Sequence, residues 1–258
     1  MAKNALITGA TAGIGASFAQ LLANEGYDLV LVARDLTRLQ ATARNLAERF
    51  GISCEVLPAD LSLESDIVRV EERLNNLDSP IEILINNAGF AIKESFTKSS
   101  LSAEIQLLDV LARTPMRLMH SALQAMMVRN AGIIISVSSV AGWTAGGTYS
   151  AAKSYLTVLS ESLHTELTGT KVEVLALCPG FTHTEFHDRA KMKMNGLPNF
   201  LWLNADEVVA KAWTDALAGK AISVPGRQYQ ILSTIARFGP RPLVRRLGMK
   251  IRVKQRSK

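Results

Sequence analysis

The sequence has few cysteines and few histidines, since its 258 residues include only two cysteines and four histidines. Cys54 and Cys178 both lie in apolar, strand-like runs, and neither has a second ligand at metal-site spacing. We therefore predict two buried free thiols in a reducing compartment. His183 and His187 are four residues apart, but no third ligand follows them in pattern, so we expect no metal site.

Long hydrophobic runs, internal repeats and low-complexity linkers are missing as well. No uncharged apolar run reaches the roughly 18 residues that indicate a membrane-spanning helix. The chain enters a strand almost at Met1, which leaves no room for a signal peptide and predicts a cytoplasmic protein. With 48% hydrophobic and 20% charged residues it can bury a full core, and we predict one domain over residues 1–258.

Acidic residues are absent from the end of the chain, where residues 227–258 hold ten Lys/Arg and no Asp/Glu. The net charge of +6 comes from this basic extension, because the preceding part carries 19 basic and 23 acidic residues. Such an amphipathic segment can lie on an anionic membrane, meet an acidic carrier protein or pack on the protein itself. No stacking aromatics are interleaved with the charges, so we expect no nucleic acid. The apolar residues of the basic extension that recur at helical spacing are Ile231, Leu232, Ile235, Phe238, Leu243, Val244 and Leu247.

What the chain does contain is an alternation of short apolar runs with helix-period segments. Runs that are apolar nearly throughout are typical of strands covered on both faces, and their alternation with helices predicts a doubly wound Rossmann fold with a seven-stranded, mostly parallel sheet and helices on both faces. The predicted strands are 5–8, 28–33, 53–58, 81–86, 132–138, 172–178 and 221–224, and the predicted helices are 13–25, 36–50, 64–76, 101–129, 149–168 and 205–218.

A glycine-rich loop joins the first strand to the first helix. Gly9, Gly13 and Gly15 would let the backbone turn tightly and approach a pyrophosphate at the start of the helix. The loop therefore predicts dinucleotide binding, with a plain tight turn as the alternative. The other loop residues in this candidate site are Thr11, Ala12 and Ile14.

The end of the second strand bears on the choice of dinucleotide. Arg34 follows the strand and Arg38 lies one helical turn on, where a cation can bind the 2′-phosphate of NADP. Asp35 would favour NAD, but its position as a helix N-cap explains it. We predict that NADP(H) is preferred over NAD(H).

Two further strand ends supply candidate cofactor residues. Asp60, followed by Leu61, could meet an adenine amino group or could simply cap the loop, and both alternatives stay open. After Asn86, the small residues of the Asn87-Ala88-Gly89 turn would let backbone lie against the cofactor, unless this is an ordinary strand-end turn.

The residues that carry chemistry lie between Ser139 and Lys153. Tyr149 and Lys153 are four residues apart, so on a helix they share one face, with Cβ atoms roughly 5–6 Å apart. A cation beside a phenol favours the phenolate and lowers its pKa, which makes Tyr149 a usable general acid or base. Ser139 ends a strand-like run and could hold a carbonyl oxygen.

At this point the chain resembles the short-chain dehydrogenase/reductase family over roughly residues 3–225. The motifs that carry the resemblance, in the family's order, are Thr8–Gly15, Asn86–Gly89, Ser139, Tyr149–Lys153 and Pro179-Gly180. It implies hydride transfer between NAD(P)H and a carbonyl or alcohol, with Tyr149 as proton donor, Lys153 binding the nicotinamide ribose and Ser139 orienting the substrate. It also implies a homodimer or homotetramer through helices 101–129 and 149–168. Phe181, Thr182 and Thr184 would line the nicotinamide side.

Two departures from the family pattern stand out. The asparagine that completes a proton relay in many members corresponds to Leu111, whose backbone carbonyl could still hold the relay water, so we expect a modified relay. Ser139 and Tyr149 are ten residues apart, about three fewer than the family's usual spacing, which keeps Ser138 open as the alternative catalytic serine.

An irregular apolar stretch, residues 183–204, is predicted to be a mobile lid over an apolar substrate, with packing on the core as the alternative. Its apolar residues are Phe186, Met192, Met194, Leu197, Phe200, Leu201 and Trp202. Together these features predict an NADP(H)-dependent reductase of an apolar ketone or acyl substrate. The alternative is a non-catalytic dinucleotide-binding regulator, for which Leu111 would mark a lost relay.

Overall fold

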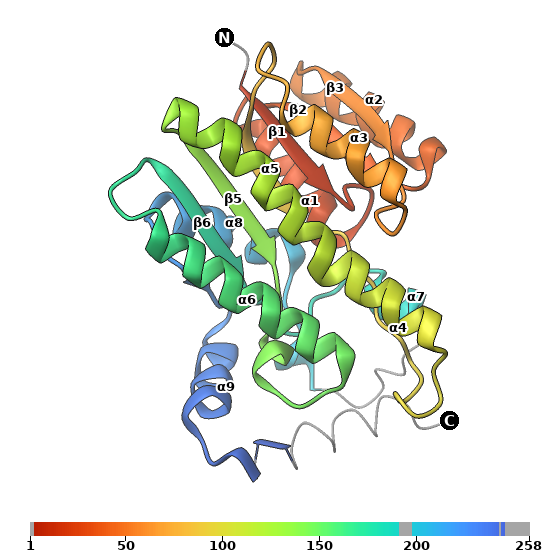
Figure 1. Ribbon diagram of the computed structural model, residues 1–258, viewed down its shortest axis with the longest axis vertical. Coiled ribbons are helices and arrows are strands. Elements are labelled where there is room, and N and C mark those ends of the chain that lie inside the picture. Colours follow the sequence, from red (N-terminus) through yellow and green to blue (C-terminus); the bar gives the residue numbers. More distant parts are fainter. Residues whose placement is uncertain (1–2, 191–197, 243, 246–258) are drawn as a thin grey trace.

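A computed structural model describes residues 3–190, 198–242 and 244–245. Its centre is one seven-stranded sheet in which every pairing is parallel, in the order β3-β2-β1-β4-β5-β6-β7 (Figure 1). This order confirms the doubly wound fold, and each strand end lies within one residue of its predicted position. The strands are β1 (Asn4–Thr8), β2 (Asp28–Ala33), β3 (Cys54–Pro58), β4 (Ile81–Asn86), β5 (Gly132–Val137), β6 (Val172–Leu177) and β7 (Ile222–Ser223).

Helices cover both faces of the sheet (Figure 1). On one face α1 (Gly13–Asn24), α2 (Leu36–Phe50) and α8 (Ala205–Leu217) pack through residues such as Phe18 and Leu39. On the other face α3 (Glu64–Leu74), α5 (Thr114–Arg129) and α6 (Thr148–Glu166) pack through residues such as Leu118 and Leu156. Strands buried from both sides are what uninterrupted apolar runs predict.

The predicted helix over 101–129 is wrong in one respect, because it is interrupted. The structure has α4 (Leu101–Leu108), a π-helical turn over Asp109–Arg113, and then α5. Pro115 sits in the first turn of α5 and lies four residues after Leu111. A proline has no N–H to donate to the Leu111 carbonyl, and in a regular helix its ring would clash with that carbonyl. The wider turn, in which Thr114 N–H bonds Asp109 O, avoids the clash.

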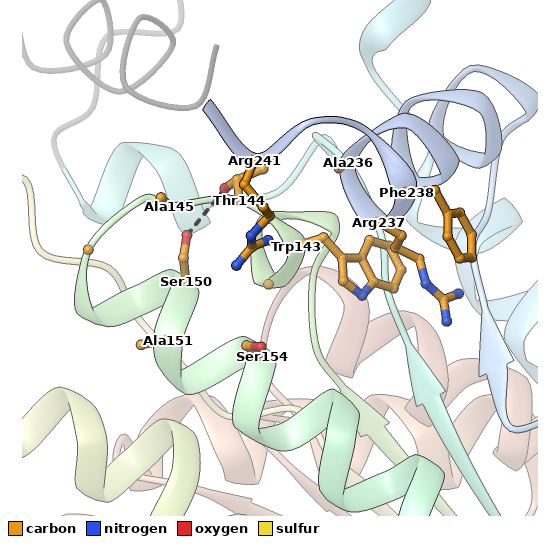
Figure 2. A pocket seen from close by; sticks show the side chains of 12 residues that line it. Trp143, Thr144, Ala145, Ser150, Ala151, Ser154, Ala236, Arg237, Phe238 and Arg241 are labelled. Atoms are coloured by element: carbon orange, nitrogen blue, oxygen red, sulfur yellow. Dashed lines mark hydrogen bonds between the residues drawn. The ribbon is translucent and has the colours of Figure 1, made fainter. Parts of the chain in front are cut away.

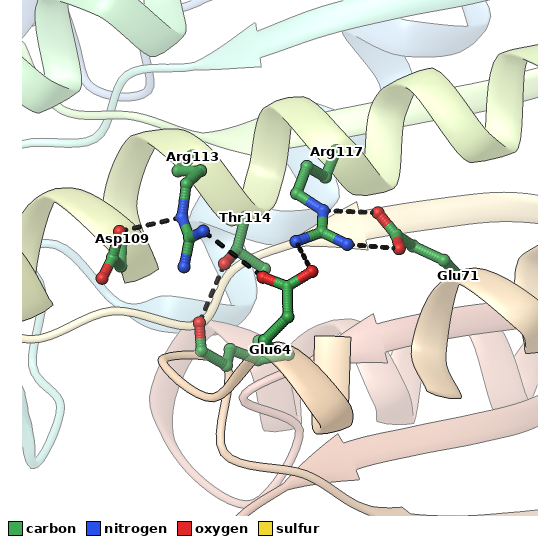
Figure 3. Close-up of polar contacts among 7 residues, drawn as sticks. Glu64, Glu71, Asp109, Arg113, Thr114 and Arg117 are labelled. Carbon is green, nitrogen blue, oxygen red and sulfur yellow. Dashed lines mark hydrogen bonds and ion pairs between the residues drawn. The ribbon is translucent and has the colours of Figure 1, made fainter. Parts of the chain in front are cut away.

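An ion-pair network joins this interrupted helix to α3 (Figure 3). Arg117 donates two hydrogen bonds of 2.7 Å to Glu71 and one of 2.6 Å to Glu64. Arg113, in the π-helical turn, pairs with Glu64 at 3.4 Å and with Asp109 at 2.9 Å. These hydrogen bonds raise the pKa of Arg117 and lower that of Glu64. The network ties the π-helical turn and the start of α5 to α3.

The basic extension begins with α9 (Arg227–Phe238). Its buried residues are Tyr229 and Ser233, which belong to the polar side of the predicted amphipathic pattern. The helix packs on the body, as one alternative predicted, but through this polar side; the apolar stripe faces outward, since Ile231, Leu232, Ile235 and Phe238 are exposed. Val244 is buried, whereas Leu243 and Leu247 lie outside the described residues. Within the part that the structure describes, no helix is long and apolar enough to cross a membrane.

Candidate functional site

The glycine-rich loop folds as its residues require. Gly9 has a φ of +68°, a conformation that side chains disfavour, and a Cβ on Gly15 would lie 2.2 Å from Gly9 O. The N-cap of α1 is Ala12, whose methyl group cannot accept the N–H groups at the start of the helix. A phosphate can therefore meet those N–H groups, and the helix dipole favours its charge.

The turn after β4 braces this loop. The Asn87 side chain donates to Thr8 O at 2.9 Å and to Gly9 O at 3.2 Å, while Thr8 Oγ1 accepts from the N–H groups of Asn87 and Ala88. Gly89 comes next, and a Cβ there would lie 2.8 Å from Leu111 Cδ2 and 4.0 Å from Lys153 Nζ. The turn thus brings the glycine-rich loop and the Lys153 ammonium to the same end of the sheet.

At the predicted ribose-phosphate position, Arg34 is exposed and Arg38 is already engaged. Arg38 donates to the Glu185 carboxylate at 3.1 and 2.9 Å and to Thr11 O at 3.2 Å. Asp35 accepts the Arg38 N–H at 3.0 Å, which confirms its predicted N-cap position. Nothing in the sequence pattern indicated Glu185, because its partner lies 147 residues away.

Asp60 and Leu61 follow β3. Asp60 Oδ1 accepts from Ser62 N–H at 3.0 Å and from Ser62 Oγ at 2.7 Å, so the carboxylate holds its own turn. The Leu61 side chain is buried, and its carbonyl accepts from Thr114 Oγ1 at 2.8 Å (Figure 3). The loop-capping alternative is therefore correct for Asp60 Oδ1, which bonds within its own turn. Contact of Asp60 or Leu61 with adenine stays a prediction.

Tyr149 and Lys153 share one face of α6. Tyr149 is half-buried in the first turn, and the Lys153 Nζ lies 5.9 Å from the centre of its ring. Lys153 is only 4% exposed, and its ammonium donates to Val137 O at 2.6 Å. Burial lowers the pKa of Lys153 to about 8. An ammonium that is buried, has one described hydrogen bond and lies beside a phenol can stabilise a phenolate.

The two neighbouring serines have different surroundings. Ser138 is buried, donates to Lys153 O at 2.7 Å and shares a 2.6 Å hydrogen bond with Thr157 Oγ1. Ser139 is half-buried and is the N-cap of the short 3-10 helix Val140–Trp143, where its hydroxyl accepts from Ala141 N–H at 3.1 Å. The Ser138 hydroxyl is thus committed to the base of α6, and Ser139 is the more accessible of the two.

Leu111 is fully buried in the π-helical turn. It packs with Leu107 and Ala152, and the half-buried Tyr149 lies against this small cluster. An aliphatic side chain therefore stands beside the phenol where the resemblance implies an asparagine.

The residues after β6 are held by α9. Pro179 is buried, and a Cβ on Gly180 would lie 2.0 Å from the Tyr229 ring. The Tyr229 hydroxyl donates to Leu201 O at 2.6 Å and accepts from Phe181 N–H at 3.0 Å. Burial raises the pKa of Tyr229 to about 12. Sequence reasoning missed Tyr229; the available signal was a tyrosine outside the apolar stripe of its helix.

The predicted lid is closed at its base. Leu203 N–H bonds Phe181 O at 2.8 Å and His183 N–H bonds Leu203 O at 3.0 Å, so the two ends of the segment lie together. The His183 ring stacks on Trp202 with ring centres 4.6 Å apart. Phe186, in the short α7 (Phe186–Arg189), lies 6.0 Å from the Tyr149 ring. The lid reaches the candidate catalytic residue; Met192, Met194, Leu197 and the side chain of His187 lie outside the described residues.

Comparison with known proteins identifies the family. Residues 3–195 match the family described as short chain dehydrogenase. The chain is a short-chain dehydrogenase. It is therefore an oxidoreductase, and its resemblance to this family is confirmed.

Several relatives extend along most of the dehydrogenase. It is 29% identical over 243 residues to Ketoacyl reductase HetN of Nostoc sp., covering 92% of this chain and 82% of the relative. It is 32% identical to a short-chain dehydrogenase from Sphingobium yanoikuyae solved in complex with NADPH, with a TM-score of 0.83 and coverage of 99% and 98%. It is 28% identical to the bulky-bulky ketone specific alcohol dehydrogenase from Comamonas testosteroni, with a TM-score of 0.79 and coverage of 99% and 96%.

A hollow of about 520 Å³ opens on another flank of α6, between the turn after β5 and α9 (Figure 2). Its lining includes Trp143, Ser150, Ser154 and Arg241, but neither Tyr149 nor Lys153. The Arg237 guanidinium stands 5.3 Å from the Trp143 ring centre. In this dehydrogenase α9 therefore borders the short turn that leads from Ser139 to Tyr149.

Proposed function

We propose that this dehydrogenase reduces an apolar ketone or ketoacyl substrate with NADP(H). One observation carries the proposal: the buried Lys153 ammonium lies 5.9 Å from the Tyr149 ring centre, beside the turn that braces the glycine-rich loop. A proton donor is thus built at the same end of the sheet as a dinucleotide loop, which is where open α/β sheets bind ligands.

The residues present fit a dinucleotide. The uncapped start of α1 after Ala12 and the close backbone of Gly9 and Gly15 would hold the pyrophosphate, with Thr11, Gly13 and Ile14 in the same loop. Asn87, Ala88 and Gly89 would border the nicotinamide ribose with Lys153; Pro179, Gly180, Phe181, Thr182 and Thr184 would border the nicotinamide. Bound NADPH would supply the hydride.

The preference for NADP(H) rests on Arg34 and Arg38. Both are cations at the end of β2, where a 2′-phosphate needs them. The Sphingobium relative, solved with NADPH, supports the same assignment. Asp60 and Leu61 would border the adenine.

The protein's own residues supply the proton. We assign Tyr149 as the acid that protonates the substrate oxygen as the carbonyl carbon is reduced to an alcohol. Lys153 stabilises the phenolate that forms, because its charge is held in a medium of low dielectric constant. Ser139 would orient the substrate oxygen, since it is half-buried and donates only a long 3.5 Å hydrogen bond to Pro179 O, whereas Ser138 is buried and donates to Lys153 O at 2.7 Å.

The apolar character of the substrate is supported by the lid. Phe181, Phe186 and Trp202 gather aromatic surface between the end of β6 and Tyr149. The names of two relatives, a ketoacyl reductase and a bulky-bulky ketone specific enzyme, agree with this class of substrate.

The experiment is a screen of apolar ketones and ketoacyl thioesters with NADPH and NADH, followed by the absorbance of the reduced nicotinamide. Tyr149→Phe should reduce turnover at least about 100-fold, the typical contribution of a positioned acid, and leave NADPH binding nearly unchanged. Tyr155→Phe, which alters an exposed tyrosine of the same helix, is the control. Activity that survives Tyr149→Phe would mean that the acid is wrongly assigned. NADPH binding with no turnover on any ketone would favour the regulator.

A homodimer or homotetramer is also part of the proposal. The outer faces of α4, α5 and α6 carry large apolar side chains in contact with solvent, which a second copy of the chain would cover. They are Leu101, Ile105, Leu108, Met116, Tyr155 and Val158.

A second role, contact with an anionic membrane, is favoured by α9. Its exposed apolar stripe begins beside the exposed Arg227, the arrangement of a helix that lies in a membrane interface. The test is sedimentation with vesicles of anionic or neutral lipid. Because Tyr229 belongs to the site, the variant is Ile235→Ser with Phe238→Ser, not removal of residues 227–258. Equal binding by the variant and the parent, or no binding by either, would contradict the role.

A further inference from the structure

Glu185 joins the predicted lid to the predicted 2′-phosphate site. The residue lies just before α7, and its carboxylate accepts two hydrogen bonds from Arg38, at 3.1 and 2.9 Å. Arg189 donates to the same carboxylate at 2.6 Å. The hydrogen bonds from Arg38, which have the larger effect, and from Arg189 lower the pKa of Glu185 to about 2. The carboxylate is therefore charged at neutral pH.

The two hydrogen bonds between Arg38 and Glu185 affect what else the Arg38 guanidinium can bind. A guanidinium presents parallel N–H groups that suit a carboxylate or a phosphate equally well. The Glu185 carboxylate uses the same N–H groups that a 2′-phosphate would need. Arg38 also donates to Thr11 O in the glycine-rich loop at 3.2 Å, so it is fixed beside the cofactor loop.

The strength of the pair decides what it can do. The Arg38 and Glu185 side chains are 41% and 49% exposed, so water screens their attraction. Such a pair is easily displaced by a phosphate of nearly two negative charges. It can therefore weaken the binding of a phosphorylated cofactor without abolishing it.

We propose that Glu185 is a specificity-determining residue that competes with the 2′-phosphate of NADP(H) for Arg38 and so sets the ratio of NADP(H) to NAD(H) affinity. The proposal rests on the proposed NADP(H) function and adds a residue from the lid to the cofactor site. Binding of NADP(H), but not of NAD(H), releases Glu185 from Arg38 and so frees the first turn of the lid.

The experiment compares the parent with Glu185→Gln by calorimetric titration of NADP⁺ and NAD⁺ at low salt. The variant keeps the size of the side chain and removes its charge. NADP⁺ should bind about two- to fivefold more tightly and NAD⁺ should be nearly unaffected, as expected for loss of one exposed charge contact. The gain should shrink at high salt.

A matched control is Glu55→Gln, because Glu55, on β3, is 45% exposed and pairs at 2.7 Å with Arg73 of α3. It makes the same change in net charge and should leave both affinities unchanged. If Glu185→Gln weakens NADP⁺ and NAD⁺ alike, the ion pair closes over the cofactor and the proposal is wrong. An unchanged ratio would overturn it as well.

Arg38→Leu separates this inference from the proposed cofactor preference. Selective loss of NADP⁺ binding in Arg38→Leu supports the arginine as the phosphate ligand, and Glu185→Gln in that background should then have no further effect on the ratio. If Arg38→Leu leaves NADP⁺ binding intact, Arg38 is not the phosphate ligand and the competition has failed, whereas a parent that binds NAD⁺ as tightly as NADP⁺ would show that the cofactor assignment itself has failed. If Arg38→Leu is selective and Glu185→Gln is not, only the competition has failed.

Discussion

Lys153 holds a positive charge where the protein has little water. Its ammonium has one described hydrogen bond, to Val137 O, and it is 4% exposed. The burial that lowers its pKa to about 8 also makes the charged form costly in the folded state. Destabilisation of a charge at a site that needs it is a common feature of catalytic centres.

This cost predicts how stability changes with pH. In the unfolded chain Lys153 titrates near 10.5, and in the folded protein near 8. Between these values the unfolded chain binds the extra proton, so Lys153 makes the folded state more stable as pH rises. The unfolding free energy of the parent, relative to that of Lys153→Met, should rise by up to about 3 kcal/mol from pH 8 to pH 10.5. Urea titrations at both pH values measure the difference. A difference that does not change with pH would contradict the burial of this charge.

The contact of Tyr229 with Gly180 gives a second prediction. Gly180→Ala places a methyl group 2.0 Å from the ring and should destabilise the protein by about 1–3 kcal/mol. Tyr229→Phe leaves the Phe181 N–H and the Leu201 carbonyl without their partner and should cost about 1–3 kcal/mol. In a Tyr229→Ala background, Gly180→Ala should cost much less. Chemical unfolding of the double-mutant cycle tests this, and additive costs would show that the two residues do not meet.

Residue identities predicted the local chemistry better than the distant contacts. The N-cap at Asp35 and the shared face of Tyr149 and Lys153 follow from spacings of three and four residues. The partners of Arg38 and Gly180, by contrast, come from segments that only the fold brings near. No periodicity in the sequence indicates Glu185 or Tyr229, because neither belongs to an apolar pattern.

At the scale of the element, strands were more predictable than helices. A strand that is buried on both faces needs a run of apolar residues. Where that run starts and stops in the sequence therefore indicates where the strand begins and ends, as in β2 and β4. The hydrophobic spacing over residues 101–129, by contrast, predicts one continuous helix. Its interruption depends on Pro115 and on how the displaced backbone packs, which hydrophobic spacing does not report. The orientation of the α9 apolar stripe stayed open in the sequence because amphipathicity does not say which face is covered.

The π-helical turn predicts a cost at Leu111. Leu111→Ala removes a fully buried side chain beside Gly89 and should destabilise the protein by about 2–5 kcal/mol. Leu111→Asn should also destabilise it, because the amide would enter an apolar cluster. Leu217→Ala, at a leucine that is 63% exposed, should change stability by no more than about 0.5 kcal/mol. Thermal and urea unfolding compare the three. A Leu111→Ala protein as stable as the parent would show that the turn is not tightly packed.

For the whole molecule, the exposed side chains of α4 to α6 predict an effect on assembly. Val158 is 61% exposed on α6, within the surface that the proposed oligomer would bury. Val158→Asp should shift the protein toward monomer, since an interface that covers this side chain would have to bury an unpaired charge. Val68→Asp on α3 is the control. Size-exclusion chromatography with light scattering gives the masses. Equal masses for the parent and Val158→Asp would place any interface elsewhere.

The Tyr229 contacts also bear on how the protein is made. The strands from β1 to β6 and the segment around Gly180 are synthesised before residue 229. Until then the Phe181 N–H and the Leu201 carbonyl lack the hydroxyl that pairs with them in the finished fold. A nascent or truncated chain can therefore form most of the sheet while the base of its lid is unfinished. Competence to bind substrate should therefore be acquired only after α9 has been added.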